Sequence, residues 1–300
     1  MSVDAGLTTA DPATTPSAPR AAGRRGLVLR RLRRNPLAVV SAVVLLLAVL
    51  VAVLAPVISP YAPDATDFGR ILAPPGTPGH LLGTDDLGRD VLSRIMVGMR
   101  ASLLVALLAV ITALVLGVPL GMLAGYVRGL DAVISRLTDL LLAFPFLILA
   151  VGLAAIRGAS LANAAIAIGI SQVPGVIRVV RSETLRLKHL DFVAASVVHG
   201  ASDLWVLGRH VLPNATSVVL VQATVALPGA VLGEAVLSFL GLGIQPPDPS
   251  LGTMLASAQA FATRAPWAAV MPGIAIMLLA LAFNVFGDAL RDALDPKGTS

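Results

Sequence analysis

Six long runs of apolar residues dominate the chain and constrain its fold more than any other feature. A bilayer core about 30 Å thick needs about 20 apolar residues in a helix. The runs do not alternate between apolar and polar residues as the strands of a membrane barrel do. They predict an all-α polytopic membrane protein with six transmembrane helices, at Leu37–Ile58, Ser102–Tyr126, Leu137–Ile156, Leu161–Ile177, Ser217–Gly243 and Trp267–Phe286.

The composition excludes several other classes of protein. Hydrophobic residues make up 56% of the 300 residues and charged residues only 13%, about half the charged share of an ordinary soluble domain. So little polar surface argues against a soluble enzyme, a disordered chain or a nucleic-acid-binding protein. The chain has no cysteine, which removes disulfides, thiolate nucleophiles and cysteine metal sites.

The polar segments divide the chain into parts. Residues 1–23, rich in Ala, Thr, Pro and Ser, predict a disordered tail, and residues 24–58 combine a basic juxtamembrane segment with the first helix. That apolar run is longer than the 7–15 residues of a signal peptide, so we expect an uncleaved anchor. Residues 59–101 form an extracytoplasmic loop, 102–290 a core with five further helices and an inner connection at 178–216, and 291–300 a second tail.

The distribution of basic residues predicts the orientation. Of the 22 Lys and Arg residues, 16 fall in segments that are cytoplasmic if the N-terminus is cytoplasmic, and six fall in the opposite segments. Cytoplasmic loops carry an excess of Lys and Arg. We therefore expect both termini in the cytoplasm, with the Arg-rich segment Arg24–Arg34 at the anionic inner leaflet in contact with membrane lipid.

Few residues of the chain are arranged to carry out catalysis or to bind a metal or ATP. All four histidines lie in connections, and no zinc-binding spacing occurs. His80 with Asp85, Asp86 and Asp90 resembles a metal site only loosely, and Gly83, Thr84 and Gly88 favour turns and helix caps there. Neither lysine belongs to a phosphate-binding Gly-Lys-Ser/Thr motif, so any ATP must be bound by another chain. We expect no metal and no cofactor on this chain.

Two acidic residues, Asp139 and Glu234, lie within the apolar runs. A charge held in the bilayer is costly and by default suggests a function. Asp139 is near the inner end of its run and equally fits an interfacial role, whereas Glu234 lies deeper and suggests a translocation pathway or an interhelical hydrogen bond. A secondary transporter driven by an ion gradient, with both residues as ion sites, is the main alternative. An intramembrane hydrolase would need a base at membrane depth, and no histidine lies there.

The inner connection 178–216 is the most informative polar segment. Apolar residues between Leu185 and Val197 predict a helix that ends at Gly200, and Leu204–Val211 predicts a second short helix that stops at Pro213. Two short helices that meet at a glycine would suit docking into a groove of another protein. An amphipathic helix at the membrane surface fits the same pattern, and the residues alone leave both interpretations open.

Four motifs in order resemble one family. Gly200 followed by RHVLPN, at Arg209–Asn214, resembles the EAA loop of bacterial ABC importer permeases. His80–Arg94, Leu237–Ser250 and Phe283–Pro296 resemble the dipeptide/oligopeptide/nickel branch of these binding-protein-dependent inner-membrane components, and its C-type permease in particular. The resemblance covers about residues 25–297. It implies a type I ABC importer permease fold and a peptide substrate.

The resemblance also implies partners. They are a second, B-type permease that completes the pathway, two ABC ATPase subunits that bind ATP and Mg, and an extracytoplasmic solute-binding protein. The Glu-Ala-Ala motif of the family falls on Ala194, Ala195 and Ser196, so its acidic residue is missing, and Asp191 is the nearest substitute.

Three groups of site residues are expected, the first two from the resemblance and the third from the acidic residues within the apolar runs. The expected ATPase-coupling residues are Asp191, Ala194, Ala195, Ser196, Gly200, Ala201, Ser202, Asp203, Arg209, His210 and Pro213. The expected outer-loop residues on the binding-protein side are Asp85, Arg89, Asp90, Gln245 and Asp248. Glu234 and Asp139 are the expected pathway residues.

Overall fold

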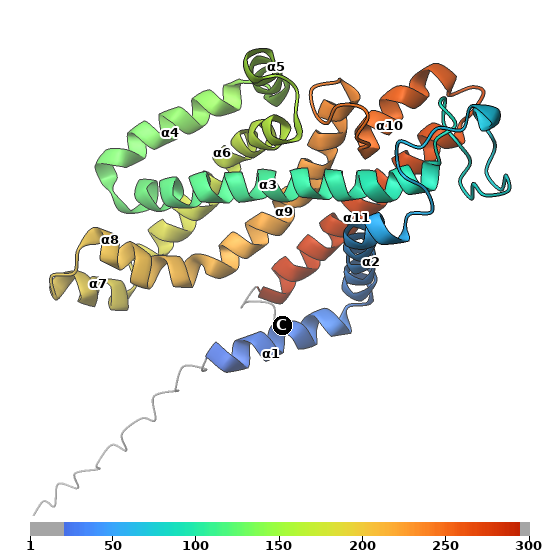
Figure 1. The fold of residues 1–300 in the computed structure, drawn as a ribbon. Coiled ribbons are helices and arrows are strands. Elements are labelled where there is room, and N and C mark those ends of the chain that lie inside the picture. The colour runs from blue at the N-terminus through green and yellow to red at the C-terminus, as the bar shows by residue number, and fades with distance from the viewer. Residues whose placement is uncertain (1–20, 295–300) are drawn as a thin grey trace, which may run out of the picture.

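The computed structural model describes residues 21–294, which form a bundle of long helices (Figure 1). Most of the tail expected at 1–23, and the end of the tail expected at 291–300, lie outside these residues. The helices are α1 (Ala21–Arg34), α2 (Pro36–Ile58), α3 (Val91–Tyr126), α4 (Arg128–Ala143), α5 (Phe146–Arg157), α6 (Leu161–Lys188), α7 (Asp191–Val198), α8 (Asp203–Val206), α9 (Leu212–Phe239), α10 (Leu251–Ala258) and α11 (Trp267–Leu294). Short turns η1 (Phe68–Arg70), η2 (Leu207–Val211) and η3 (Gln259–Phe261) complete the order.

Five of the predicted spans are confirmed as helices long and apolar enough to cross a membrane. The third is wrong as a single straight helix, because α4 and α5 meet at an angle of 85°. Pro145 stands at the break and directly precedes α5. A proline disfavours helical backbone at the residue before it, and Phe144 accordingly has an extended conformation.

The most extensive helix packing among the described residues joins α3 to α6, in part through glycines. Gly117, Gly121 and Gly125 follow one another at intervals of four residues and therefore share one face of α3. A Cβ atom on Gly121 would lie 2.8 Å from Cβ of Val180, and one on Gly117 or Gly125 would meet α6 equally closely. Small residues at this spacing let membrane helices approach closely. We call these three glycines the glycine stripe.

The direction of α3 and α6 explains why the bent pair is needed. Gly117 faces Val176 and Gly125 faces Thr184, so the two helices run parallel. The chain must therefore return from the end of α3 to the start of α6, and α4 and α5 make that return between them. The bent pair thus accounts for the sixth crossing that the sequence predicts.

The helix α2 lies at the edge of the bundle (Figure 1). Asn35 caps its first turn by accepting hydrogen bonds from the backbone N–H groups of Leu37 and Ala38, and Pro36 occupies the first helical position. One face buries small residues such as Ala52 and Ala55 against the bundle, while leucines and valines cover the other faces. Such a helix is suited to face lipid.

Candidate functional site

The α7–α8 surface lies at one end of the molecule, and the loop segment 59–90, which we call the cap, lies at the other end (Figure 1). The long helix α3 runs between them. The segment expected as a single helical stripe up to Gly200 is divided into α6 and α7 by His189 and Leu190. Three regions of the structure bear on function: the α7–α8 surface, a groove along α6 and α9, and the cap with its neighbouring outer loop.

The turn after α7 depends on Gly200. Its N–H group donates to the carbonyl of Val197, and the next N–H group, of Ala201, donates to the carbonyl of Ser196. These bonds form a Schellman motif, which needs a left-handed residue at the first position after the cap. Gly200 has φ +80° and meets this need. The predicted meeting of two short helices at this glycine is confirmed.

His210 holds the α7–α8 surface together. Its Nε2 atom lies 2.9 Å from the hydroxyl of Ser196 on α7. Its ring meets the edge of Trp205 on α8 at 5.0 Å and lies 5.9 Å from the ring of Phe192. Two of the expected coupling residues, Ser196 and His210, are therefore in direct contact, and they fix α7 relative to α8.

Apolar side chains project from the α7–α8 surface. Val198 is 85% exposed, Leu204 is 77% exposed, and Trp205 is half-exposed. A hollow of about 630 Å³ lies beside them, lined in part by Ala195, Gly200 and Ser202. Asp191, Asp203 and Arg209 are also exposed. A surface with this much unpartnered apolar area is typical of a site of protein contact.

The prediction that the second short helix stops at Pro213 is wrong. Residues 203–239 form one continuous helical path in which Pro213 belongs to the first turn of α9. Its ring would clash with the carbonyl of the residue four positions earlier in a regular helix. The π-helical segment η2 removes this conflict, because the N–H of Leu212 bonds to the carbonyl of Leu207.

A groove of about 520 Å³ opens along α6 and α9, bordered by the junction of α4 and α5. We call it the α6–α9 groove. Most of its lining is apolar or glycine, but Ser171 and Gln172 on α6 and Gln222 on α9 add polar groups at membrane depth. Oε1 of Gln172 is buried and has no hydrogen-bond partner among the described residues. An uncharged polar lining of this kind suits a solute with amide groups.

Glu234 does not line this groove. Its neighbours Gly233 and Val236 do, whereas Glu234 points to the other side of α9 and is fully buried. Its Oε1 atom accepts a 2.7 Å hydrogen bond from the Ser238 hydroxyl. This bond lies within α9, so the structure places Glu234 behind the groove wall, and a role in the pathway or between helices stays a prediction.

Asp139 lies on the surface of α4. It faces Arg178 on α6 with an N–O distance of 3.4 Å, and both side chains are mostly exposed. A second pair, Asp131 with Arg181, joins the same two helices through bonds of 2.6 and 2.7 Å. Asp139 therefore contributes to the contact between α4 and α6, and its role at the membrane interface or in a pathway stays a prediction.

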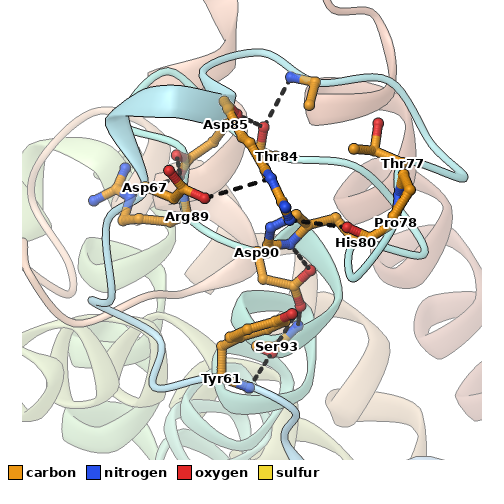
Figure 2. Close-up of polar contacts among 12 residues, drawn as sticks. Tyr61, Asp67, Thr77, Pro78, His80, Thr84, Asp85, Arg89, Asp90 and Ser93 are labelled. Atoms are coloured by element: carbon orange, nitrogen blue, oxygen red, sulfur yellow. Dashed lines mark hydrogen bonds and ion pairs between the residues drawn. The ribbon is translucent and has the colours of Figure 1, made fainter.

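The cap is built around the pair His80 and Asp90 (Figure 2). Nδ1 of His80 lies 3.0 Å from Oδ1 of Asp90, and the ring of Tyr61 stacks on the imidazole at 5.0 Å. The other carboxyl oxygen of Asp90 caps α3 by accepting from the N–H and hydroxyl of Ser93. The cap is thus fixed to the start of α3, which begins at Val91, well before the apolar run.

The other two acidic residues of this cluster, Asp85 and Asp86, pair with arginines. Asp85 accepts a 2.7 Å bond from Nε of Arg89 and lies 3.5 Å from Nε of Arg94 (Figure 2 shows Asp85 and Arg89). The side chains are nearly buried. Asp85, Arg89 and Asp90 therefore hold the cap together instead of facing outward. Within residues 21–294, no group of three His, Asp or Glu side chains is arranged to hold a metal ion.

Gln245 and Asp248 lie differently from the other expected outer-loop residues. Both are exposed and line a hollow of about 420 Å³, together with Arg100 at the beginning of the apolar part of α3. Nε2 of Gln245 donates to the carbonyls of Gly241 and Gly243, which shapes the loop. These two residues thus remain available to a ligand or partner at the cap end.

Family models match the chain over most of its length. The model described as "Binding-protein-dependent transport system inner membrane component" matches residues 117–299. The chain belongs to this family. A second model, the N-terminal TM domain of oligopeptide transport permease C, matches residues 24–75. The predicted resemblance to a C-type permease is confirmed.

Curated relatives cover nearly the whole chain. The dipeptide transport system permease protein DppC of Escherichia coli K12 is 46% identical, over 88% of this chain and 90% of that protein. DppC of Haemophilus influenzae is 41% identical, over 88% and 92%. The glutathione transport system permease protein GsiD of Pectobacterium atrosepticum is 42% identical, over 89% of each chain.

Solved structures support the fold. An inward-facing MetNI methionine ABC transporter has a TM-score of 0.53 at 21% identity, over 66% of this chain and 97% of that chain. A second crystal form has a TM-score of 0.51. The fold is therefore that of an ABC importer permease, in agreement with the predicted fold.

Family membership decides between the alternatives. This permease is a multi-pass inner-membrane component of a binding-protein-dependent ABC transporter, and the ATPase is a separate subunit. The family carries no cofactor on the permease chain. Membership implies an ATPase and a solute-binding protein as partners. The alternative of a secondary transporter driven by an ion gradient is overturned.

Proposed function

We propose that this permease forms one half of a pathway that imports short peptides, and that the α6–α9 groove is its half of that pathway. The groove is open along α6 and α9, so a second, B-type permease would supply the opposite wall. Ser171, Gln172 and Gln222 would face the solute. The open, amide-lined groove at membrane depth is the observation that carries this proposal.

The relatives suggest the class of solute. The names of these relatives refer to dipeptides, di/tripeptides and glutathione. Peptides of this size share amide N–H and C=O groups, which hydrogen-bond well to the neutral amides of Gln172 and Gln222. A neutral lining also avoids trapping either charged terminus during passage. Selection among peptides would then rest mainly on the solute-binding protein.

The proposal also assigns a side of the membrane and a partner to each end of the permease. Both termini would be cytoplasmic, with the α7–α8 surface against one of two ATPase subunits and the cap on the binding-protein side. Asp191, Gly200, Asp203 and Arg209 would lie in or beside the ATPase contact, in which Asp191 replaces the missing acidic residue. Gln245 and Asp248 would face the binding protein. Closure of the ATPase pair would move α7 and, through η2, the groove-lining helix α9.

The test is uptake of a radiolabelled dipeptide by the whole importer in proteoliposomes. Gln222→Leu removes the amide from the groove, and Gln259→Leu removes one from an exposed position outside it. We expect at least a tenfold loss of uptake for the first variant and unchanged uptake for the second, with ATP as the required energy source. Equal uptake by both variants would contradict the assignment of the groove.

A further inference from the structure

A separate groove lies between α1, α2 and α11, at the end of α2 that adjoins the Arg-rich helix. It has a volume of about 350 Å³. Leu29 and Leu32 of α1, Ala42 and Leu46 of α2, and Phe286 of α11 contribute to its apolar walls, and Arg33 is the one charged residue that lines it. We propose that this groove, the lipid groove, binds an acyl chain of an anionic phospholipid whose head group lies on Arg33.

The length of the groove matches one leaflet. From Pro36, where α2 begins, to Leu46 the helix rises about 15 Å at 1.5 Å per residue, which is half of the roughly 30 Å hydrocarbon core. Leu46 therefore reaches the middle of the membrane while Arg33 stays at its surface. A groove that starts at an arginine and continues along apolar side chains for this distance has the shape of one lipid chain beneath its head group.

The positive charge of the α1 arginines favours an anionic head group. Arg30, Arg33 and Arg34 are exposed, and none of them forms an ion pair with an acidic residue in the part of the chain that the structure describes. Basic pockets beside transmembrane helices on the cytoplasmic side bind anionic lipid head groups. The guanidinium group is also suited to hydrogen-bond a phosphate with two N–H groups.

The lipid would add to a contact between α1 and α11 that the structure already shows. Arg31 of α1 donates a 3.4 Å hydrogen bond to the carbonyl of Ala293 in the last turn of α11. An acyl chain between Leu29, Leu46 and Phe286 would add apolar contact among all three helices. The inference rests on the proposed cytoplasmic N-terminus only for its choice of leaflet, and not on the transported solute.

Native mass spectrometry of the purified importer tests this site without any transport assay. The complex is equilibrated in mild detergent with equal amounts of phosphatidylglycerol and phosphatidylcholine. We expect one phosphatidylglycerol to remain per permease. Arg33→Gln, which removes the charge, and Ala42→Phe, which fills the groove, should each lower this occupancy at least fivefold.

Two matched controls should keep the lipid. Arg136→Gln removes an exposed arginine of α4, and Val40→Phe enlarges an exposed residue of α2 outside the groove. If Ala42→Phe impairs folding, as a thermal melt would reveal, Arg33→Gln on the surface still tests the site. Equal occupancy in all variants, or equal retention of phosphatidylcholine, would overturn the proposal.

A cross-linking experiment separates the lipid from a protein occupant. The chain has no native cysteine, so Leu46→Cys would be its only thiol. We expect this thiol to react with a maleimide carried on a lipid and to form no cross-link to another subunit. A cross-link to the second permease would show that a protein chain covers the groove, and would also overturn the proposal.

Discussion

The Ser238 hydroxyl donates a 2.7 Å hydrogen bond to Oε1 of Glu234, one helical turn earlier on α9, and both side chains are buried. The hydroxyls of Ser102 on α3 and Ser250 before α10 lie near this carboxyl group. Its Oε2 atom is buried and has no hydrogen-bond partner among the described residues. Glu234 thus links α9 to α3 and α10 from behind the wall of the α6–α9 groove.

Substitution of Glu234 separates this linking role from contact with the solute. Glu234→Ala leaves buried hydroxyls without an acceptor, which costs about 1–3 kcal/mol for such a group, so the Tm should fall. Glu234→Gln keeps the shape and an acceptor, and its KM for dipeptide should stay within twofold of wild type. A folded Glu234→Gln importer that has lost uptake would show that the carboxylate takes part in transport.

The glycine stripe predicts that large side chains are not tolerated where α3 packs on α6. Gly121→Leu places a side chain where even a Cβ atom would be 2.8 Å from Val180. Overpacking of this kind costs about 1–3 kcal/mol or more, so little folded permease should be recovered by size-exclusion chromatography. Gly152→Leu on α5 is the matched control, because nothing lies within 4 Å of its Cβ position. Equal recovery of both variants would contradict the packing of α3 on α6.

Much of the fold could be predicted from apolar run length alone, because each span must satisfy its own backbone hydrogen bonds in lipid. The break at Pro145 could not, because a proline inside a membrane helix more often gives only a kink. The stripe at Gly117, Gly121 and Gly125 was missed although its spacing is visible in the sequence. A search for small residues at intervals of four would have found it.

The cap predicts that Asp85 is a structural residue. Asp85→Ala removes the carboxylate nearest to the nearly buried Arg89 and Arg94, which keep Asp86 at 3.5 Å and the carbonyl of Pro63 as partners. Loss of one member of a buried pair costs about 3–5 kcal/mol. The cap should then be cut by trypsin at a concentration that leaves wild type intact. Asp248→Ala changes an exposed carboxylate and should leave the cap resistant. Resistance in both variants would contradict this assignment.

Substitutions of Gly200 should affect coupling according to the backbone conformation that the new residue allows, and not according to the size of its side chain. Its φ of +80° strains any β-branched residue, whereas Asn adopts this region readily. Gly200→Val should therefore uncouple ATP hydrolysis from dipeptide uptake, and Gly200→Asn should preserve most of the coupling. The space around Gly200 is open, so a steric effect would instead impair both variants alike.

The candidate site was less predictable than the fold. His210 and Ser196 were identified by motif, but their contact depends on the return of the chain at Gly200. The continuation of the helix through Pro213 depends on a π-helical segment that no residue pattern predicts. The groove residues Gln172 and Gln222 were missed, because they come from helices far apart in the chain and only the packing of α6 and α9 brings them together.

The central claim, that the α7–α8 surface binds an ATPase subunit, is tested most directly by cross-linking. Val198→Cys introduces one thiol at a side chain that is 85% exposed, and Val57→Cys introduces one at a similarly exposed position at the far end of α2. The whole importer is treated with a short thiol-to-amine cross-linker, and the products are identified by mass spectrometry. We predict an ATPase adduct for Val198→Cys and none for Val57→Cys. An active importer in which Val198→Cys forms no ATPase adduct would contradict the claim.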